Sequence, residues 1–169
     1  MRFLTCAVFA LASLAACNPT FNWRDVRFES ARLALLMPCK PDKVMRIVPM
    51  AGQPTDLNLL SCDAGGVTFA VAVADVKDAA KVEAALTQWQ NATLANIKAP
   101  PALGAAFKPP GLASAGVLVQ ATGQRTNGRA VASHAAYFAQ GSQVFQAVLY
   151  ADKIAPDVAE TFFSGLKFE

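Results

Sequence analysis

The stretch GGVTFAVAVADVKDAAKVEAALTQWQNATLANIK, residues 65–98, decides the fold class because its periodicity changes part-way along it. Residues 67–76 are an almost continuous β-prone run after a Gly-Gly turn, which predicts a strand inside a sheet. From Asp78, a suitable N-cap, helix-forming residues dominate. One helical stripe contains Val82, Leu86, Trp89, Thr93 and Ile97. We therefore expect a strand and then a long helix, over about 78–98, that packs on the sheet.

Six further segments have the alternation or the β-branched content of strands, and they lie on both sides of this stretch. They are residues 28–37, 43–50, 56–63, 116–124, 129–139 and 143–151. Two turn signals separate neighbouring runs, PMAGQP at 49–54 and the Asn127-Gly128 pair, which is a strong hairpin signal. The pattern predicts antiparallel hairpins, and a short strand is expected near Ala105–Lys108 in the loop after the helix.

Proline marks one end of each of two expected helices. Pro100-Pro101 end the long helix, and Pro156 stands at the first position of a second helix over about 156–166. In that second helix Val158, Phe162 and Leu166 form one apolar line. Together these elements predict an α+β domain with a central antiparallel sheet of about six or seven strands.

Residues 1–16, MRFLTCAVFALASLAA, have the pattern of a secretory signal. A charge at Arg2 precedes an apolar run that is too short to cross a bilayer as a helix, which takes about 20 residues. Leu14-Ala15-Ala16-Cys17 resembles the lipobox of bacterial lipoproteins at all four positions. The resemblance implies cleavage before Cys17, a diacylglycerol on its thiol, and several acyl chains that anchor the protein stably. The alternative is a secreted protein in which Cys17 merely follows the cleavage site.

This interpretation divides the chain into a signal peptide at 1–16, a lipid-anchored tether at 17–25 and one globular domain at 26–169. In the sorting pattern of bacterial lipoproteins, Asn18 points to the outer membrane, so we expect a bacterial cell envelope protein that faces the periplasm. Removal of residues 1–16 takes away Arg2, and the formal net charge falls from +3 to +2. So mild a charge argues against a nucleic-acid partner.

Two cysteines then remain, Cys39 and Cys62, because Cys6 leaves with the signal and Cys17 carries lipid. An even pair in an oxidising compartment predicts one disulfide. If the two face each other across a hairpin, the turn centre lies near 50.5, one residue before the centre of PMAGQP, so we expect a bulge or an asymmetric loop. A redox-active pair is the alternative, but the C-x-x-C spacing is missing.

Three stretches resemble landmarks of the Mog1/PsbP-like domain, which is common among small bacterial lipoproteins. They are ALLMPCKPDK (34–43), GGVTFAVAVADV (65–76) and AETFFSGLKF (159–168). The resemblance spans about residues 26–168 and rests on composition rather than on chemical motifs. It implies an α/β/α sandwich and a binding or assembly module, because members of that family share no catalytic constellation. Metal sites proposed in some plant members have no matching motif here.

Few residues are candidates for catalysis. His134 is the only histidine, and in the strand over 129–139 it points to the opposite face from Ser133, so the two cannot form a dyad. The acidic residues fall mostly at expected turns and helix starts, and no P-loop motif occurs. We therefore expect no catalytic residues, no metal site and no cofactor.

These observations lead us to expect a non-catalytic binding or assembly module. Its expected partners are the membrane, through the lipid on Cys17, and another envelope protein. The alternative is a carrier or sensor of a small apolar ligand held between the sheet and the 78–98 helix. The aromatic residues fit either function, because core packing and a pocket lining use the same side chains.

Overall fold

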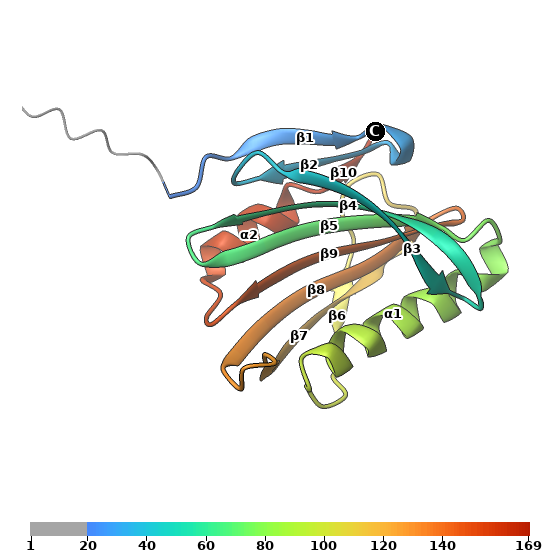
Figure 1. Cartoon of the computed structure of the whole chain (residues 1–169). Helices are drawn as coiled ribbons and strands as arrows, with labels where there is room; N and C mark the ends of the chain where they lie inside the picture. The colour runs from blue at the N-terminus through green and yellow to red at the C-terminus, as the bar shows by residue number, and fades with distance from the viewer. Residues whose placement is uncertain (1–19) are drawn as a thin grey trace, which may run out of the picture.

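The expected change from strand to helix is present in the computed structural model, which describes residues 20–169 (Figure 1). Strand β5 spans Val67–Asp75, and helix α1 spans Val82–Asn96. Between them the Asp78 carboxylate accepts a hydrogen bond from the backbone N–H of Ala80, 2.9 Å away. This cap belongs to a 3-10 turn, η2 at Ala79–Lys81, so α1 itself begins later than the expected start at residue 78.

Within the described residues, seven antiparallel strands form the main sheet, in the order β3-β4-β5-β9-β8-β7-β6. Their bounds, besides those of β5, are β3 Asp42–Met50, β4 Gln53–Ala64, β6 Ala105–Phe107, β7 Gly116–Gln124, β8 Ala130–Gln140 and β9 Gln143–Ala151. The prediction of an α+β chain with a central antiparallel sheet is confirmed. The short strand expected near residue 105 is β6, at the edge of this sheet.

The described part of the chain also forms a sheet of three strands, in the order β1-β2-β10, which has no counterpart in the sequence-based prediction. β1 Arg24–Phe28 and β2 Leu33–Met37 flank a 3-10 turn, η1 Glu29–Ala31, and β10 Lys167–Phe168 pairs with β2. The single strand predicted over 28–37 is wrong, because the chain reverses at Arg32, whose φ is +49°. Only the second half of the predicted segment forms a strand, β2, and its alternating apolar side chains are buried in the core.

The packed part of the chain extends into the segment 17–25 that the sequence assigned to a tether. β1 begins at Arg24. Just before it, Phe21 and Trp23 make edge-on aromatic contacts with Phe69 of β5, with ring centroids 6.1 and 5.8 Å apart. Such contacts add to the area that aromatic side chains bury, so they hold this segment against the sheet.

Different elements cover the two faces of the main sheet, and Figure 1 shows α1 and α2 on opposite sides of it. Tyr137 and Phe138 are neighbours in β8 and therefore point to opposite faces. On the Tyr137 side, α1 packs against β8 and β9 through Leu94. On the Phe138 side, one core joins the three-stranded sheet and helix α2, Pro156–Ser164. No helix within residues 20–169 is both long and apolar enough to cross a membrane.

Candidate functional site: an exposed edge strand beside a polar hollow

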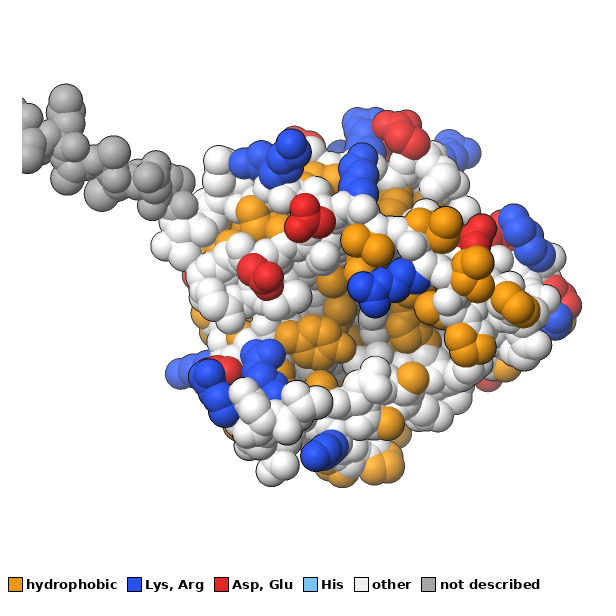
Figure 2. Space-filling model, in the orientation of Figure 1, with side chains coloured by type: hydrophobic (Ala, Val, Ile, Leu, Met, Phe, Trp, Pro, Cys, Tyr) orange, Lys and Arg blue, Asp and Glu red, His pale blue; other side chains and the backbone are white. Residues whose placement is uncertain are grey.

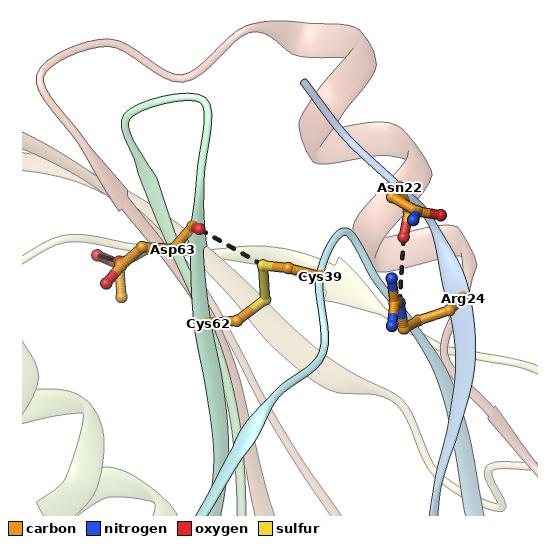
Figure 3. Close-up of a disulfide and its surroundings, with 6 residues drawn as sticks. Asn22, Arg24, Cys39, Cys62 and Asp63 are labelled. Atoms are coloured by element: carbon orange, nitrogen blue, oxygen red, sulfur yellow. Dashed lines mark hydrogen bonds between the residues drawn. A yellow bond between two sulfur atoms is a disulfide. The ribbon is translucent and has the colours of Figure 1, made fainter. Parts of the chain in front are cut away.

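Cys39 and Cys62 form a disulfide, with their Cα atoms 6.1 Å apart (Figure 3). Cys62 lies in β4, and Cys39 lies in the turn before β3. Cys39 Sγ also lies 3.5 Å from the carbonyl oxygen of Asp63. This is a packing contact, because a disulfide sulfur has no hydrogen to donate. The bond ties the start of β3 to β4.

The pairing of these cysteines is confirmed, but the geometry predicted for it is wrong. Asp42 pairs with Ser61 and Met50 pairs with Gln53, so the turn centre is at 51.5, the centre of PMAGQP. At this register a strand residue at position 39 would face Ala64 and not Cys62. Cys39 reaches Cys62 because it lies outside the ladder, which starts at Asp42, and the hairpin needs neither a bulge nor an asymmetric loop.

Two other residues were singled out in the sequence, Cys17 and His134. Cys17 lies outside the described residues, so its lipidation stays a prediction. His134 lies in β8 between Gln120 and Leu149, and burial lowers the pKa of its imidazole below the usual 6.5. Within residues 20–169 no group of three or more His, Cys, Asp or Glu could hold a metal ion.

A buried polar network lies beneath α1. Gln146 Nε2 donates to Thr93 Oγ1 at 2.8 Å and to the Tyr137 hydroxyl at 3.2 Å, and Thr93 Oγ1 donates to the Trp89 carbonyl at 2.9 Å. Burial raises the pKa of Tyr137, and it raises the pKa of Tyr150 to about 12. Both phenols are therefore neutral at ordinary pH, and the network joins the helix to the sheet without a buried charge.

Strand β3 is an edge of the main sheet, and among the described residues only β4 pairs with it. Residues 42–47 are all exposed, including Met45 at 59% and Ile47 at 69% on one face and Val44 at 37% on the other. Figure 2 shows apolar side chains gathered on the surface in the region of β3, beside α1. An edge strand of this length presents unpaired backbone N–H and C=O groups, which can pair with another strand.

The far end of β3 is closed by α1. Gln88 Oε1 accepts a hydrogen bond from the backbone N–H of Ala51 at 3.0 Å, and Gln88 Nε2 donates to the carbonyl of Pro49 at 3.5 Å. Pro49 itself has no N–H to offer a neighbouring strand. The accessible part of the edge is therefore residues 42–48.

A polar hollow of about 530 Å³ lies beside Met45 and Ile47. Met45 faces Asn58 and Ile47 faces Asp56 across the β3–β4 ladder. Directly opposed residues point to the same face of a sheet, and both Asn58 and Asp56 line the hollow. The exposed apolar side chains of β3 thus form a lip at the outer side of a polar floor.

The inner part of the hollow holds a fixed carboxylate. Asp75 accepts hydrogen bonds from both the backbone N–H and the Nζ of Lys77, each at 2.9 Å, and from Ser142 Oγ at 2.8 Å. The bonds from Lys77, and then that from Ser142, hold the pKa of this carboxyl below its usual 3.8. Gln143 Nε2 donates to the Ser30 carbonyl at 3.1 Å and bridges the main sheet to η1. These groups can hydrogen-bond a peptide backbone or polar side chains.

Two further surfaces bear on the alternative of a small apolar ligand. The cleft between α1 and the β3–β4 hairpin, lined by Val48, Leu57 and Trp89, has a volume of about 160 Å³. Ligand pockets are larger, roughly 300–1,000 Å³. Figure 2 also shows the α1 side of the molecule hollowed between β3 and the β7–β8 hairpin.

The sequence prediction named no ligand-binding residue, and one signal could have identified the lip. Residues 43–50, KVMRIVPM, place apolar side chains on both faces of a strand through Val44, Met45, Ile47 and Val48. A strand with exposed apolar side chains on both faces can pair with another chain, so this pattern indicates a binding surface. The hollow had no such signal, because its lining comes from β4, β5, β9 and η1.

No family model and no curated protein match the chain. Among solved structures, the chain is similar to a protein from Bacteroides thetaiotaomicron, with a TM-score of 0.51 and 12% identity over 86% of this chain and 48% of the other. The chain therefore spans about half the length of that protein, and the likeness concerns the fold alone. A protein of unknown function from Pseudomonas aeruginosa aligns with a TM-score of 0.38 and 19% identity, over 80% of this chain and 85% of that one.

Proposed function

We propose that this protein is a lipid-anchored, non-catalytic binding or assembly module of the bacterial cell envelope, and that it binds a protein partner along β3. The observation that carries the proposal is the exposed edge strand, whose Met45 and Ile47 form an apolar lip beside the polar hollow. A strand added at β3 would pair its backbone with the edge and place alternate side chains over the hollow.

The domain at 26–169 is, in this proposal, a Mog1/PsbP-type α/β/α sandwich. The resemblance of residues 34–43, 65–76 and 159–168 to that family supports it, as do the positions of α1 and α2 on opposite faces of the sheet. The long helix predicted over 78–98 then corresponds to η2 and α1, and the helix predicted over 156–166 corresponds to α2 with the turn that follows it.

The anchor is proposed from the lipobox resemblance of Leu14-Ala15-Ala16-Cys17. Residues 1–16 are removed, Cys17 carries the lipid, and the domain faces the periplasm from the outer membrane. The disulfide between Cys39 and Cys62 supports this location, because such bonds persist in oxidising compartments and are rare in the cytosol.

A binding function is favoured over catalysis by the surroundings of the candidate residues. Ser133 and His134 point to opposite faces of β8, and Ser133 is only 2% exposed. Triad chemistry needs a base within hydrogen-bond reach of its nucleophile. This arrangement supplies none for Ser133.

Site-specific photo-crosslinking in intact cells tests the proposal with the full chain. A photoreactive amino acid replaces Ile47 and, in the control, Thr122, an exposed residue of β7. We expect a discrete crosslinked protein from position 47 that is absent from position 122, and mass spectrometry of the product reads the mature N-terminus at the same time. Equal crosslinking from both positions, or none from position 47, would overturn the proposal.

The second candidate function is the carriage or sensing of a small apolar ligand, favoured by the hollow that Figure 2 shows on the α1 side, between β3 and the β7–β8 hairpin. Native mass spectrometry of the full chain, released in mild detergent, tests it. A defined additional mass that disappears on unfolding supports the ligand, and a bare polypeptide mass excludes one that survives purification.

A further inference from the structure

We infer that the partner at the β3 edge is a second copy of this chain, which pairs antiparallel with the first about a two-fold axis at Val44. The inference rests on the proposed function and specifies the partner of that same site. Three observations carry it: the free edge, the order of charges along β3, and the apolar residue at the centre of that order.

Symmetry restricts the ways in which two copies of β3 can pair. Most homodimers are two-fold symmetric, and one surface then meets itself. When two antiparallel edge strands join in one continuous sheet, the two-fold axis is perpendicular to the sheet. The rotation therefore leaves every side chain on the face of the sheet to which it points. Directly opposed residues must therefore point to the same face, and the axis must pass through a residue rather than between two.

The charges of β3 single out one such register. Asp42, Val44 and Arg46 point to the α1 face, together with Val48 and Met50, which pack near α1. With the axis at Val44, Asp42 of each copy faces Arg46 of the other, and the two Val44 side chains meet between these ion pairs. Opposite charges directly across a ladder stabilise it, and like charges destabilise it.

Neighbouring registers lose this complementarity. An axis at Lys43 places the two copies of Lys43 opposite each other, and an axis at Arg46 does the same for Arg46. An axis at Met45 pairs Arg46 with Val44 and leaves Asp42 without an ionic partner. The register at Val44 also matches Met45 with the aliphatic stem of Lys43, so the exposed thioether chain gains an apolar neighbour.

In the dimer the two hollows lie on the same face of the joined sheet, because the axis is perpendicular to the sheet. One hollow lies on each side of the paired β3 strands. The Met45 and Ile47 side chains of both copies lie between them. A dimer thus presents one extended surface, polar at both ends and apolar at its centre.

Disulfide trapping with Val44→Cys in the full chain tests the inference. The two substituted positions face each other at about the Cβ separation of cross-strand pairs, within adjustment of a disulfide. We expect a dimer on non-reducing gels, with a bond between positions 44 of two copies identified by mass spectrometry. Ile47→Cys and Thr122→Cys are the controls, and neither position faces itself in this register. A dimer that forms equally well at all three positions would overturn the inference.

Charge reversal supplies the second arm. In the Val44→Cys background, Asp42→Arg alone or Arg46→Asp alone turns two attractive pairs into two repulsive ones, and the trapped dimer should fall about tenfold. The double variant Asp42→Arg with Arg46→Asp restores both pairs and should restore the dimer. An equal loss in the single and double variants would contradict the register.

The outcomes separate this inference from the proposed function. If position 47 crosslinks to a different envelope protein and Val44→Cys gives no dimer, β3 is a binding edge and the second copy is excluded as its partner. If neither experiment captures a protein, the binding function of β3 fails as well.

Discussion

Cys39 is bonded to Cys62 from a turn, so the disulfide fastens the first residues of β3 to β4 just where the edge strand enters the sheet. β3 has a single strand neighbour in the described residues and buries little of itself. Packing alone therefore holds it less firmly than an interior strand, and the covalent tie compensates.

Replacement of both cysteines by alanine should lower the free energy of unfolding by about 3 kcal/mol, as expected for a bond that closes a loop of this size. The two cysteines are 23 positions apart in sequence. Urea denaturation of the oxidised protein and the double variant measures the difference. A change below about 1 kcal/mol would show that the reduced chain already restrains this loop.

Ala51→Asn should stabilise the β3–β4 hairpin by about 0.5–1 kcal/mol, because an alanine at positive φ is strained and Asn-Gly is a favoured two-residue turn. Ala51 has φ +49° and precedes Gly52 at +79°. The Gln88 contact uses the backbone N–H of residue 51, which the substitution keeps. Urea denaturation measures the gain, and an unchanged midpoint would contradict the turn geometry.

The two tyrosines should titrate abnormally in the folded protein. Burial raises the pKa of Tyr137, and it raises the pKa of Tyr150 to about 12. The raised pKa values mean that the folded state favours the neutral phenols. The stability that the two buried, neutral phenols contribute is complete below the unfolded pKa near 10, and it is lost as the pH rises toward 12. Absorbance at 295 nm should show little ionisation at pH 10 in the native protein and normal titration in urea. Half-ionisation at pH 10 in the native protein would contradict the burial.

Substitutions on the lip should leave the fold intact. Met45→Lys and Ile47→Lys change exposed side chains, so the free energy of unfolding should change by no more than about 0.5 kcal/mol. Phe138→Ala is the contrasting variant, since Phe138 is fully buried in the core and its truncation should cost about 3–5 kcal/mol. If the lip variants unfold as easily as Phe138→Ala, the lip is part of the core and not a binding surface.

Local patterns predicted the elements that are long or that carry specific turn chemistry. Asp78 was expected to be an N-cap and does accept the capping hydrogen bond. Residues 143–151 were expected to be a strand and form β9 with those bounds. The apolar line Val158, Phe162 and Leu166 is buried against the sheet. In each case the signal lies within a few neighbouring residues, where periodicity and capping operate.

The features that the sequence did not reveal depend on contacts between distant segments. β10 is two residues long and exists because Lys167 and Phe168 pair with Ala34 and Leu33. The left-handed backbone at Arg32 has no residue-type signal, since glycine or asparagine usually occupies such a position. The hollow likewise draws on separate elements, so only the three-dimensional arrangement shows that it adjoins β3.

Amide hydrogen exchange along β3 tests the central claim most directly. Exchange is followed by mass spectrometry in the full chain, once in isolated envelope vesicles and once after dilution in detergent. If β3 binds another strand, peptides over 42–48 exchange more slowly in the vesicles than in the diluted protein, because strand addition hydrogen-bonds the free N–H groups of the edge. Peptides over 67–75 of β5, which pairs with both β4 and β9, should exchange alike in both samples. Equal exchange over 42–48 in the two samples would contradict the account.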